Sequence, residues 1–473
     1  MTSRSTDPLR SVTAHASVST GDPPRRELRK ETAGVTATGA PKVGRTRVDR
    51  ALSRGPLGAL RLLGPGLITG ASDDDPSGIA TYSQVGSQFG YGLLWTALFT
   101  LPLMTAVQEL CARIALQTGV GLGVTLRRKF PAALVGGAVL ALLVANTINI
   151  GADLGAVAAG INLLVDERLR PLYLVIPVAA MILMFQLFST YGRLVSIFKW
   201  LTLALFAYVI TAVLSHPSVT QLATGTVVPH LEVSADFIAA LVAVLGTTIS
   251  PYLFFWQASS EVDELHRTGE GLYRQHRGVN KRQLVAARVD VMIGMAFSQV
   301  VMYCVILTSA SALHAHGHTN VQTAQQVATS LAPLAGRFAF VIFAVGLIGT
   351  GLLAIPVLSG SAAYAAKEFL GIGGGLATKP RQRPTFYLII IAATLVGVVL
   401  NAIGLDPIRA LFITAVINGI VAAPLLVLIV LLGSDRRVMG RRVSRGLSRV
   451  LTWLAAGFMA IAAVALLVTL VRH

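Results

Sequence analysis

The sequence has 473 residues, of which 54% are hydrophobic and only 13% are charged. A soluble chain of this length has no need of so much apolar surface, so the composition excludes a soluble globular protein and indicates a membrane protein. The formal net charge of +17 would favour nucleic-acid binding only if it covered a soluble surface. The basic residues instead gather between apolar runs, so the lipid bilayer, and not nucleic acid, is the expected partner.

The N-terminal segment, residues 1–55, is rich in Ser, Thr, Gly, Pro and Arg and contains no apolar run. Such a segment buries too little apolar surface to offset the entropy of ordering. We expect it to be a disordered basic cytoplasmic tail in front of a membrane domain at residues 56–473. No signal peptide precedes the first apolar run, so that run is expected to target the chain to the membrane.

Apolar runs long enough to cross the hydrocarbon, about 20 residues each, recur through the rest of the chain. They cover approximately residues 60–88, 92–117, 132–164, 172–190, 194–214, 236–260, 285–313, 338–370, 384–404, 407–433 and 451–471. The alternating pattern of an outer-membrane barrel is absent. The sequence therefore predicts an all-α integral membrane protein with about eleven transmembrane helices.

Lysine and arginine accumulate in alternate loops. They cluster before the first run and again at Arg127–Lys129, Arg193, Arg274–Arg288, Lys379–Arg383 and Arg436–Arg449, whereas residues 215–236 contain none. With an odd number of spans, the positive-inside rule places the N-terminus in the cytoplasm and the C-terminus outside. We expect a multi-pass protein of the cell membrane with this orientation.

Catalytic and thiol-based chemistry find no support in the sequence. Cys111 and Cys304 both lie within predicted helices, so neither a disulfide framework nor a thiolate cluster is expected. No Ser-His-Asp set, H-E-x-x-H motif or phosphate-binding loop is present, and neither an enzyme nor a bound cofactor is predicted. The histidines of the loop His314–His318 could form a weak metal-collecting tract or could simply be solvated.

The first apolar run is interrupted at its centre by Asp73, Asp74, Asp75 and Pro76. Proline removes a backbone donor and disfavours helix at the residue before it, so the helix should unwind near Asp75. Each ionised Asp facing lipid would cost about 2.5–3.5 kcal/mol, so these side chains should face a water-filled cavity or a bound cation. Asp73 and Asp74 could alternatively cap a half-helix or line a vestibule.

A second interruption occurs five spans later, where Gly246, Thr247, Thr248 and Ser250 precede Pro251 in an otherwise apolar run. A proline kink with hydroxyls bonded back to the helix is one interpretation. Paired interruptions at matching places in two halves instead indicate an inverted-repeat transporter with its site between them. Glu109, an acid within the second span, could assist a proton or cation pathway or pair with Arg113 at the i,i+4 spacing.

The first span carries Gly64-Pro65-Gly66, eight further residues, then Asp75-Pro76-Ser77-Gly78 and Ala80-Thr81. These motifs resemble the Nramp family of divalent metal transporters. The likeness continues through Gly86–Trp95, Ala112–Gly119 and Ala152–Leu164, and it covers residues 60 to about 433. The resemblance implies a LeuT-like fold of two inverted five-helix repeats, about 60–214 and 236–433, with helices 1 and 6 broken and an extra helix at 451–471.

The departures from the family pattern lie in the site itself. Gly78 replaces the family's metal-binding Asn, Ser250 its Met, Tyr252 its His, and Ala156 the Glu of the third helix. Asp75 alone is retained as a ligand. The resemblance extends to an Nramp-related branch that includes magnesium transporters and also lacks the Met.

The resulting ligand set contains oxygen only. It comprises Asp75, the Ser250 hydroxyl and carbonyls near Ser72 and Thr247, with Gly78 leaving room for retained waters. Without a soft thioether, such a set favours Mg²⁺, Mn²⁺ or Ca²⁺ over Fe²⁺ or Cu⁺. Asp153 could relay protons or make a polar contact to helix 1. Asn418 lies near the position of a metal-facing Gln in the family, or bridges helices.

The predicted function is secondary transport of divalent metal cations, Mg²⁺ or Mn²⁺ favoured, by alternating access. Proton coupling is expected to be weak or absent, because the family's Glu and His are Ala156 and Tyr252, although Glu109 and Asp153 could carry protons instead. The alternative is a LeuT-like transporter of an organic substrate such as an amino acid, whose carboxylate the half-helix N-termini could bind. Three acids at the first break argue against an anion. The sequence leaves the oligomeric state open.

Overall fold

The computed structural model describes residues 64–165, 171–189, 191–215, 217–267, 281–319, 326, 337–376, 378–402 and 406–472. The predicted tail at 1–55 and much of the loop after residue 267 lie outside these ranges. In the described part, eight helices are long and apolar enough to cross a membrane, and Leu172–Phe188 is a shorter apolar helix. Of the remaining two expected spans, that at 60–88 is helical but broken between Asp73 and Pro76, and that at 194–214 is helical with a 3-10 stretch at Thr202–Leu205.

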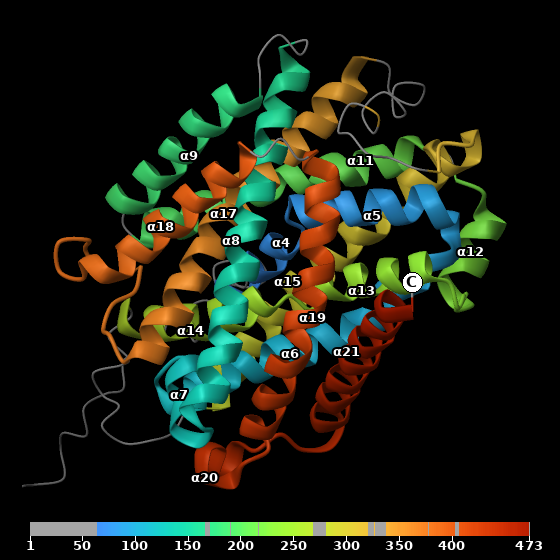
Figure 1. Cartoon of the computed structure of the whole chain (residues 1–473). Coiled ribbons are helices and arrows are strands. Elements are labelled where there is room, and N and C mark those ends of the chain that lie inside the picture. Colours follow the sequence, from blue (N-terminus) through green and yellow to red (C-terminus); the bar gives the residue numbers. More distant parts are fainter. Residues whose placement is uncertain are drawn as a thin grey trace, which may run out of the picture. The chain divides into compact units, whose positions relative to one another are not determined.

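All the regular structure of the described residues is helical (Figure 1). The longer elements are α4 (Pro65–Asp73), α5 (Pro76–Phe89), α6 (Trp95–Thr118), α8 (Ala132–Leu164), α9 (Pro171–Phe188), α10 (Tyr191–Leu201), α11 (Phe206–Leu214), α13 (Ala235–Thr248), α14 (Pro251–Arg267), α15 (Lys281–Ala312), α17 (Arg337–Leu370), α18 (Pro384–Asn401), α19 (Pro407–Gly433) and α21 (Gly446–Arg472). Three short helices join them, namely α7 (Leu122–Lys129), α12 (Val219–Val227) and α20 (Arg436–Met439).

Both predicted interruptions are present. The helix α4 ends at Asp73 and α5 begins at Pro76, while α13 ends at Thr248 and α14 begins at Pro251. Each proline is the first residue of the helix that follows it, where its missing N–H leaves no helical hydrogen bond unmade. The prolines therefore start new half-helices at the two points where the sequence predicted that the backbone unwinds.

Two groups of helices organise the membrane domain. The bundle group is α4, α5, α6, α13, α14 and α15, in which α15 packs along α4, α5 and α6. The flanking group is α8, α9, α17 and α18, and its members α9 and α18 lie side by side (Figure 1). The first two spans of each expected repeat belong to the bundle group and the next two to the flanking group, so corresponding positions in the two halves have corresponding neighbours.

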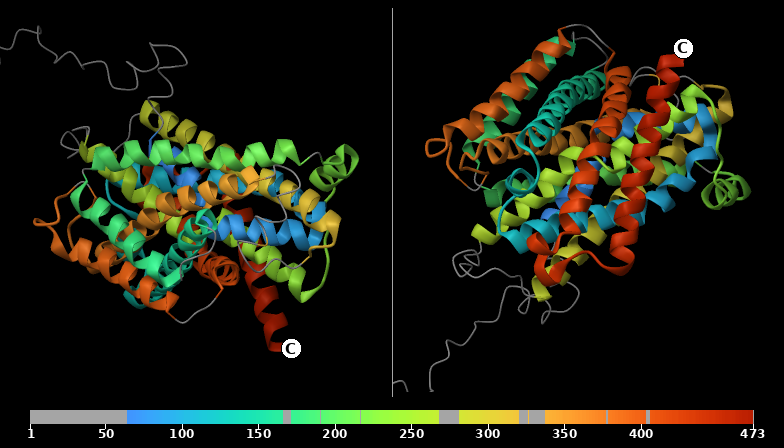
Figure 2. Two further views of the ribbon diagram at one scale, coloured as in Figure 1. Left: turned by 90° about the horizontal axis from the view of Figure 1, so that it is seen from above. Right: turned by 60° about the horizontal axis from the view of Figure 1, so that its bottom comes forward.

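The helices α19 and α21 run beside each other and also contact α13 (Figure 2). At the contact of α19 with α13, a Cβ atom on Gly246 would lie 2.2 Å from the Ala415 carbonyl oxygen and 2.5 Å from the Gly419 nitrogen. Only glycine permits this backbone approach, which is typical of helix packing in membranes. The close contact holds α13 just before its break.

The start of α4 is tied to α15 by Asp290. This buried carboxylate accepts hydrogen bonds from the backbone nitrogens of Gly64, Gly66 and Leu67 at 2.8–3.1 Å. A negative charge at a helix N-terminus satisfies free N–H groups and favours the helix dipole. The half-helix that leads to the first break is therefore held at its N-terminal end by a residue more than two hundred positions away in the sequence.

Candidate functional site

Asp75 lies at the first break and is almost completely buried, with 1% of its surface exposed. Its extended backbone makes it the N-cap of α5. One carboxylate oxygen, Oδ1, accepts hydrogen bonds from the Ser77 hydroxyl at 2.5 Å and from the Gly78 nitrogen at 2.7 Å. The capping role that the sequence offered to Asp73 or Asp74 is thus taken by Asp75, and Gly78 contributes its backbone N–H there.

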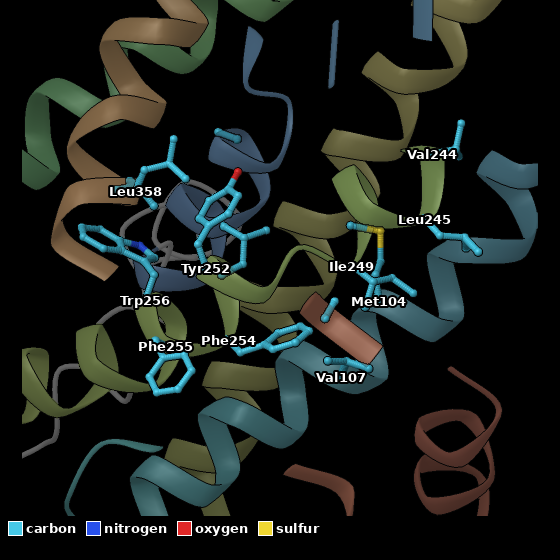
Figure 3. Packing of buried hydrophobic residues seen from close by; sticks show 14 of the residues in the cluster. Met104, Val107, Val244, Leu245, Ile249, Tyr252, Phe254, Phe255, Trp256 and Leu358 are labelled. Carbon is cyan, nitrogen blue, oxygen red and sulfur yellow. The ribbon is translucent and has the colours of Figure 1, made fainter. Parts of the chain in front are cut away.

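The other oxygen of Asp75 faces the second break. The Tyr252 hydroxyl, from the first turn of α14, lies 3.3 Å from Asp75 Oδ2 and donates to the Ser72 carbonyl oxygen at 2.6 Å. In Figure 3 the hydroxyl of Tyr252 points toward the ribbon of α4 and away from Phe254 and Phe255. Tyr252 therefore joins the two interrupted helices through two oxygens that the sequence predicted as cation ligands.

The long helix α8 supplies two further polar side chains. Asn149 donates from Nδ2 to Asp75 Oδ2 at 3.0 Å and lies 3.5 Å from Asp153 Oδ2. Both residues are fully buried. The predicted residue Asp153 is thus brought to the site through Asn149, which the sequence analysis missed. The i,i+4 spacing of Asn149 and Asp153 in an apolar helix was the available signal.

Asp73 and Asp74 face α15, where the Ser298 hydroxyl lies 2.7 Å from Asp73 Oδ2 and 3.4 Å from Asp74 Oδ1. Their other oxygens, Asp73 Oδ1 and Asp74 Oδ2, are buried without a hydrogen-bond partner in the described part of the chain. Ser298 was not predicted, because a serine in the seventh span has no distinguishing local pattern. Because Asp73 and Asp74 contact Ser298, the site extends from the first break toward α15.

The four carboxylates of this region, Asp73, Asp74, Asp75 and Asp153, are buried. Among the described residues, no Lys, Arg or His lies within hydrogen-bonding or ion-pair distance of any of them. Within the same residues, no three His, Cys, Asp or Glu side chains converge as a metal site. The hydrogen-bond partners of Asp75 are thus all neutral, and a cation there would be bound by the Asp75 carboxylate together with uncharged oxygens.

The hydroxyls of the second break bond to their own helix. Ser250 Oγ lies 2.8 Å from the Gly246 carbonyl oxygen and 2.6 Å from that of Thr247. Thr247 Oγ1 approaches the hydroxyl of Tyr82, on α5, at 3.3 Å. Such hydrogen bonds back to the helix are one of the two interpretations that the sequence allowed for this segment. A cation role for Ser250 and for the Thr247 carbonyl stays a prediction, since both atoms are engaged with each other here.

Among the described residues, the remaining predicted side chains form no hydrogen bond or ion pair with Asp75. Glu109 forms the ion pair with Arg113 that the pairing alternative predicted, and it also lies 3.5 Å from Arg288 Nε. Asn418 is buried in α19, and neither of its amide atoms has a partner in the described part of the chain. His314 and His316 bond to backbone carbonyl oxygens, and a metal-collecting role for the loop stays a prediction.

Comparison with known proteins gives a family match over residues 66–469, to the model described as natural resistance-associated macrophage protein-like (Nramp). The chain belongs to the Nramp family. A curated member, the divalent metal cation transporter MntH of Klebsiella pneumoniae (strain 342), is 29% identical over 399 residues, which cover 83% of this chain and 90% of that protein. Membership in this transporter family confirms the prediction that the chain is a transporter and not an enzyme.

Solved structures confirm the predicted fold. The manganese transporter of Eremococcus coleocola superposes with a TM-score of 0.67 at 18% identity, covering 87% of this chain and 86% of that one. Mhp1, a nucleobase-cation-symport-1 family transporter, superposes with a TM-score of 0.54 at 16% identity, covering 86% and 91%. The Nramp chain described here is therefore an all-helical, multi-pass membrane protein with a LeuT-like fold and two broken helices.

Proposed function

We propose that this Nramp protein is a secondary transporter that moves divalent metal cations across the cell membrane by alternating access. The observation that carries the proposal is the buried Asp75 carboxylate at the meeting point of two interrupted helices, surrounded by neutral oxygen and amide groups. An unpaired carboxylate is costly inside a membrane, and a bound cation removes that cost. The Klebsiella relative, a divalent metal cation transporter, and the Eremococcus relative, a manganese transporter, support the same class of cargo.

Magnesium and manganese are the favoured cargoes on the chemistry of the donors. The oxygens near Asp75 include the hydroxyls of Ser77 and Tyr252 and, bonded to Tyr252, the Ser72 carbonyl. Carboxylate, carbonyl and water ligands favour Mg²⁺, Ca²⁺ and Mn²⁺, whereas soft sulfur ligands select other transition metals. Replacement of the family's Met by Ser250 removes the soft ligand, which supports the resemblance to the magnesium-transporting branch.

Proton coupling is proposed to be weak or absent. Ala156 on α8 and Tyr252 on α14 replace the family's ionisable residues at those positions, and an ordinary tyrosine stays neutral near pH 7. Glu109 is engaged in its ion pair with Arg113. Asp153, which lies beside Asn149 near the site, is the residue on which any residual coupling would depend.

The proposed orientation keeps the N-terminus in the cytoplasm and the C-terminus outside. It rests on the distribution of Lys and Arg, including the basic last turn of α7 at Arg127–Lys129 and the cluster around α20. The matching neighbours of the first two and next two spans in each half support a division into repeats at about 60–214 and 236–433.

Transport of an organic substrate is the second candidate. The fold likeness to Mhp1, solved with bromovinylhydantoin bound, shows that this architecture also accommodates organic molecules. Buried acids at the first break, Asp73 to Asp75, disfavour a substrate carboxylate. Uptake measured with a panel of metal cations and, separately, with amino acids distinguishes the two candidate functions.

The test is uptake into proteoliposomes that contain the purified full-length protein, with a metal-sensitive dye and a pH-sensitive dye inside. We expect Mg²⁺ and Mn²⁺ to enter in preference to Cd²⁺, and Asp75→Ala to abolish uptake. Asp236→Ala, which removes an exposed acid from the first turn of α13, is the matched control and should transport like the parent. Cd²⁺ uptake faster than Mg²⁺ uptake with acidification in step, or unaltered uptake by Asp75→Ala, would contradict the proposal.

A further inference from the structure

A side-chain amide, that of Asn149, lies next to Asp75 in the structure. In this chain Gly78 stands at the family's metal-binding Asn, so the first turn of α5 supplies no side-chain amide beside Asp75. Asn149 reaches Asp75 from α8, 74 residues away in the sequence, with its Nδ2 3.0 Å from Asp75 Oδ2. An amide therefore still accompanies the carboxylate, but it comes from a different helix.

The carbonyl end of this amide is unsatisfied. Asn149 is fully buried, and its Oδ1 has no hydrogen-bond partner in the described part of the chain. The adjacent carboxylate of Asp153 has one buried oxygen, Oδ1, in the same condition. Buried acceptors without donors are uncommon and destabilising, which points to a ligand that binds oxygen.

We propose that Asn149 is a cation ligand supplied by α8, and that its amide rotates to present Oδ1 to the ion held by Asp75, with Asp153 completing the negative side of the site. This inference rests on the proposed function and adds a ligand to its site. Without a cation, Nδ2 faces Asp75 because an N–H donor satisfies the carboxylate. With a cation bound, an oxygen in the same place is favoured.

The spacing suits Mg²⁺ or Mn²⁺. Two neighbouring ligands of an octahedral Mg²⁺ ion, each about 2.0–2.1 Å from the metal, lie about 2.9 Å apart. The terminal atom of Asn149 already lies 3.0 Å from Asp75 Oδ2. A half-turn of the amide exchanges Nδ2 and Oδ1 and therefore places two oxygens at this separation without movement of either helix.

The same rotation connects two groups of helices. Asp75 belongs to the bundle group and Asn149 to the flanking group, and in the described part of the chain a hydrogen bond from Nδ2 to Oδ2 links the two side chains. Replacing that bond by two bonds to one ion strengthens the attachment of α8 to the first break. Cation binding would then change how firmly the two groups are joined, as alternating access requires.

The test measures binding of Mg²⁺ and Mn²⁺ to the purified full-length protein by isothermal titration calorimetry. Asn149→Ala should lower affinity about tenfold or more, whereas Asn149→Asp should keep affinity at or above that of the parent, because it still supplies an oxygen. Asn146 offers a matched control on the same helix, since it is buried and donates to the Leu358 carbonyl oxygen at 3.2 Å instead. Asn146→Ala should bind like the parent.

Parent-like affinity in Asn149→Ala overturns the proposal, and so does an equal loss in Asn149→Asp, which would reduce Asn149 to a donor for Asp75. Equal gains in Asn149→Asp and Asn146→Asp would show an effect of charge alone and also overturn it. If thermal unfolding without cation shows that Asn149→Ala does not fold, the comparison of cation affinity between Asn149→Asp and Asn146→Asp decides whether Asn149 is a ligand. Asp75→Ala separates a failure of the proposed function from a failure of this inference. Parent-like cation binding by Asp75→Ala refutes the proposed site itself. Loss of binding in Asp75→Ala together with parent-like binding by Asn149→Ala refutes this inference alone.

Discussion

The close approach of α4 to α15 predicts that a single methyl group at Gly70 disrupts transport. A Cβ atom on Gly70 would lie 2.1 Å from the Gly294 carbonyl oxygen and 2.2 Å from its carbonyl carbon, whereas ordinary van der Waals contact begins at 3.4 Å. The obstacle is backbone, which no change of rotamer relieves. We expect Gly70→Ala to push α4 away from α15 by about 1 Å, at a cost of about 1–3 kcal/mol in the free energy of unfolding.

The displaced half-helix ends at Asp73 and leads directly to Asp75. Misplacement by about 1 Å lowers rates about a hundredfold at catalytic centres, so we expect Mn²⁺ uptake by Gly70→Ala to fall about tenfold or more. The assay is uptake into proteoliposomes, with thermal unfolding of the same preparation. Gly457→Ala is the control, because nothing lies within 4 Å of its Cβ position on α21. Uptake and melting temperature equal to those of Gly457→Ala would refute the packing argument.

Three further predictions concern the cap, the donor set and the surface. Asp290→Asn should lower the free energy of unfolding by about 1–2 kcal/mol, since it removes the charge and one acceptor at the start of α4; an unchanged melting temperature contradicts this. Ser250→Met should shift uptake from Mg²⁺ toward Mn²⁺, Fe²⁺ or Cd²⁺ by adding a soft ligand, whereas Ser250→Ala should keep the parent's order of cation preference. The same order of preference in both variants would contradict this prediction. Asp435 has its pKa lowered from the ordinary value of 3.8, first by the hydrogen bond from Lys129 and then by that from the Arg437 nitrogen. The stabilising contribution of this carboxylate is present above pH 3.8 and is lost as the pH falls through the lowered pKa. Asp435→Asn should therefore be less stable than the parent near neutral pH but not in strong acid. Thermal unfolding of both proteins across this pH range measures the difference.

The sequence alone was sufficient for the positions of the spans and of both breaks. Spans follow from the length of apolar runs, because every backbone polar group in lipid must be bonded within a helix. Pro76 and Pro251 begin α5 and α14 for a reason that lies in the proline ring itself. These are properties of local sequence. The short helices α7 and α12 were missed because neither is long or apolar enough to be recognised as a span.

The partners of the acids were decided by tertiary structure. Asn149 meets Asp75 across 74 residues, Tyr252 meets Ser72 across 180, and Ser298 meets Asp73 across 225. In a soluble helix an apolar stripe would show which face turns inward, but helices in lipid are apolar on every side. The sequence could therefore identify Asp75 as the centre of a site, whereas only packing of the helices selected which neutral side chains surround it.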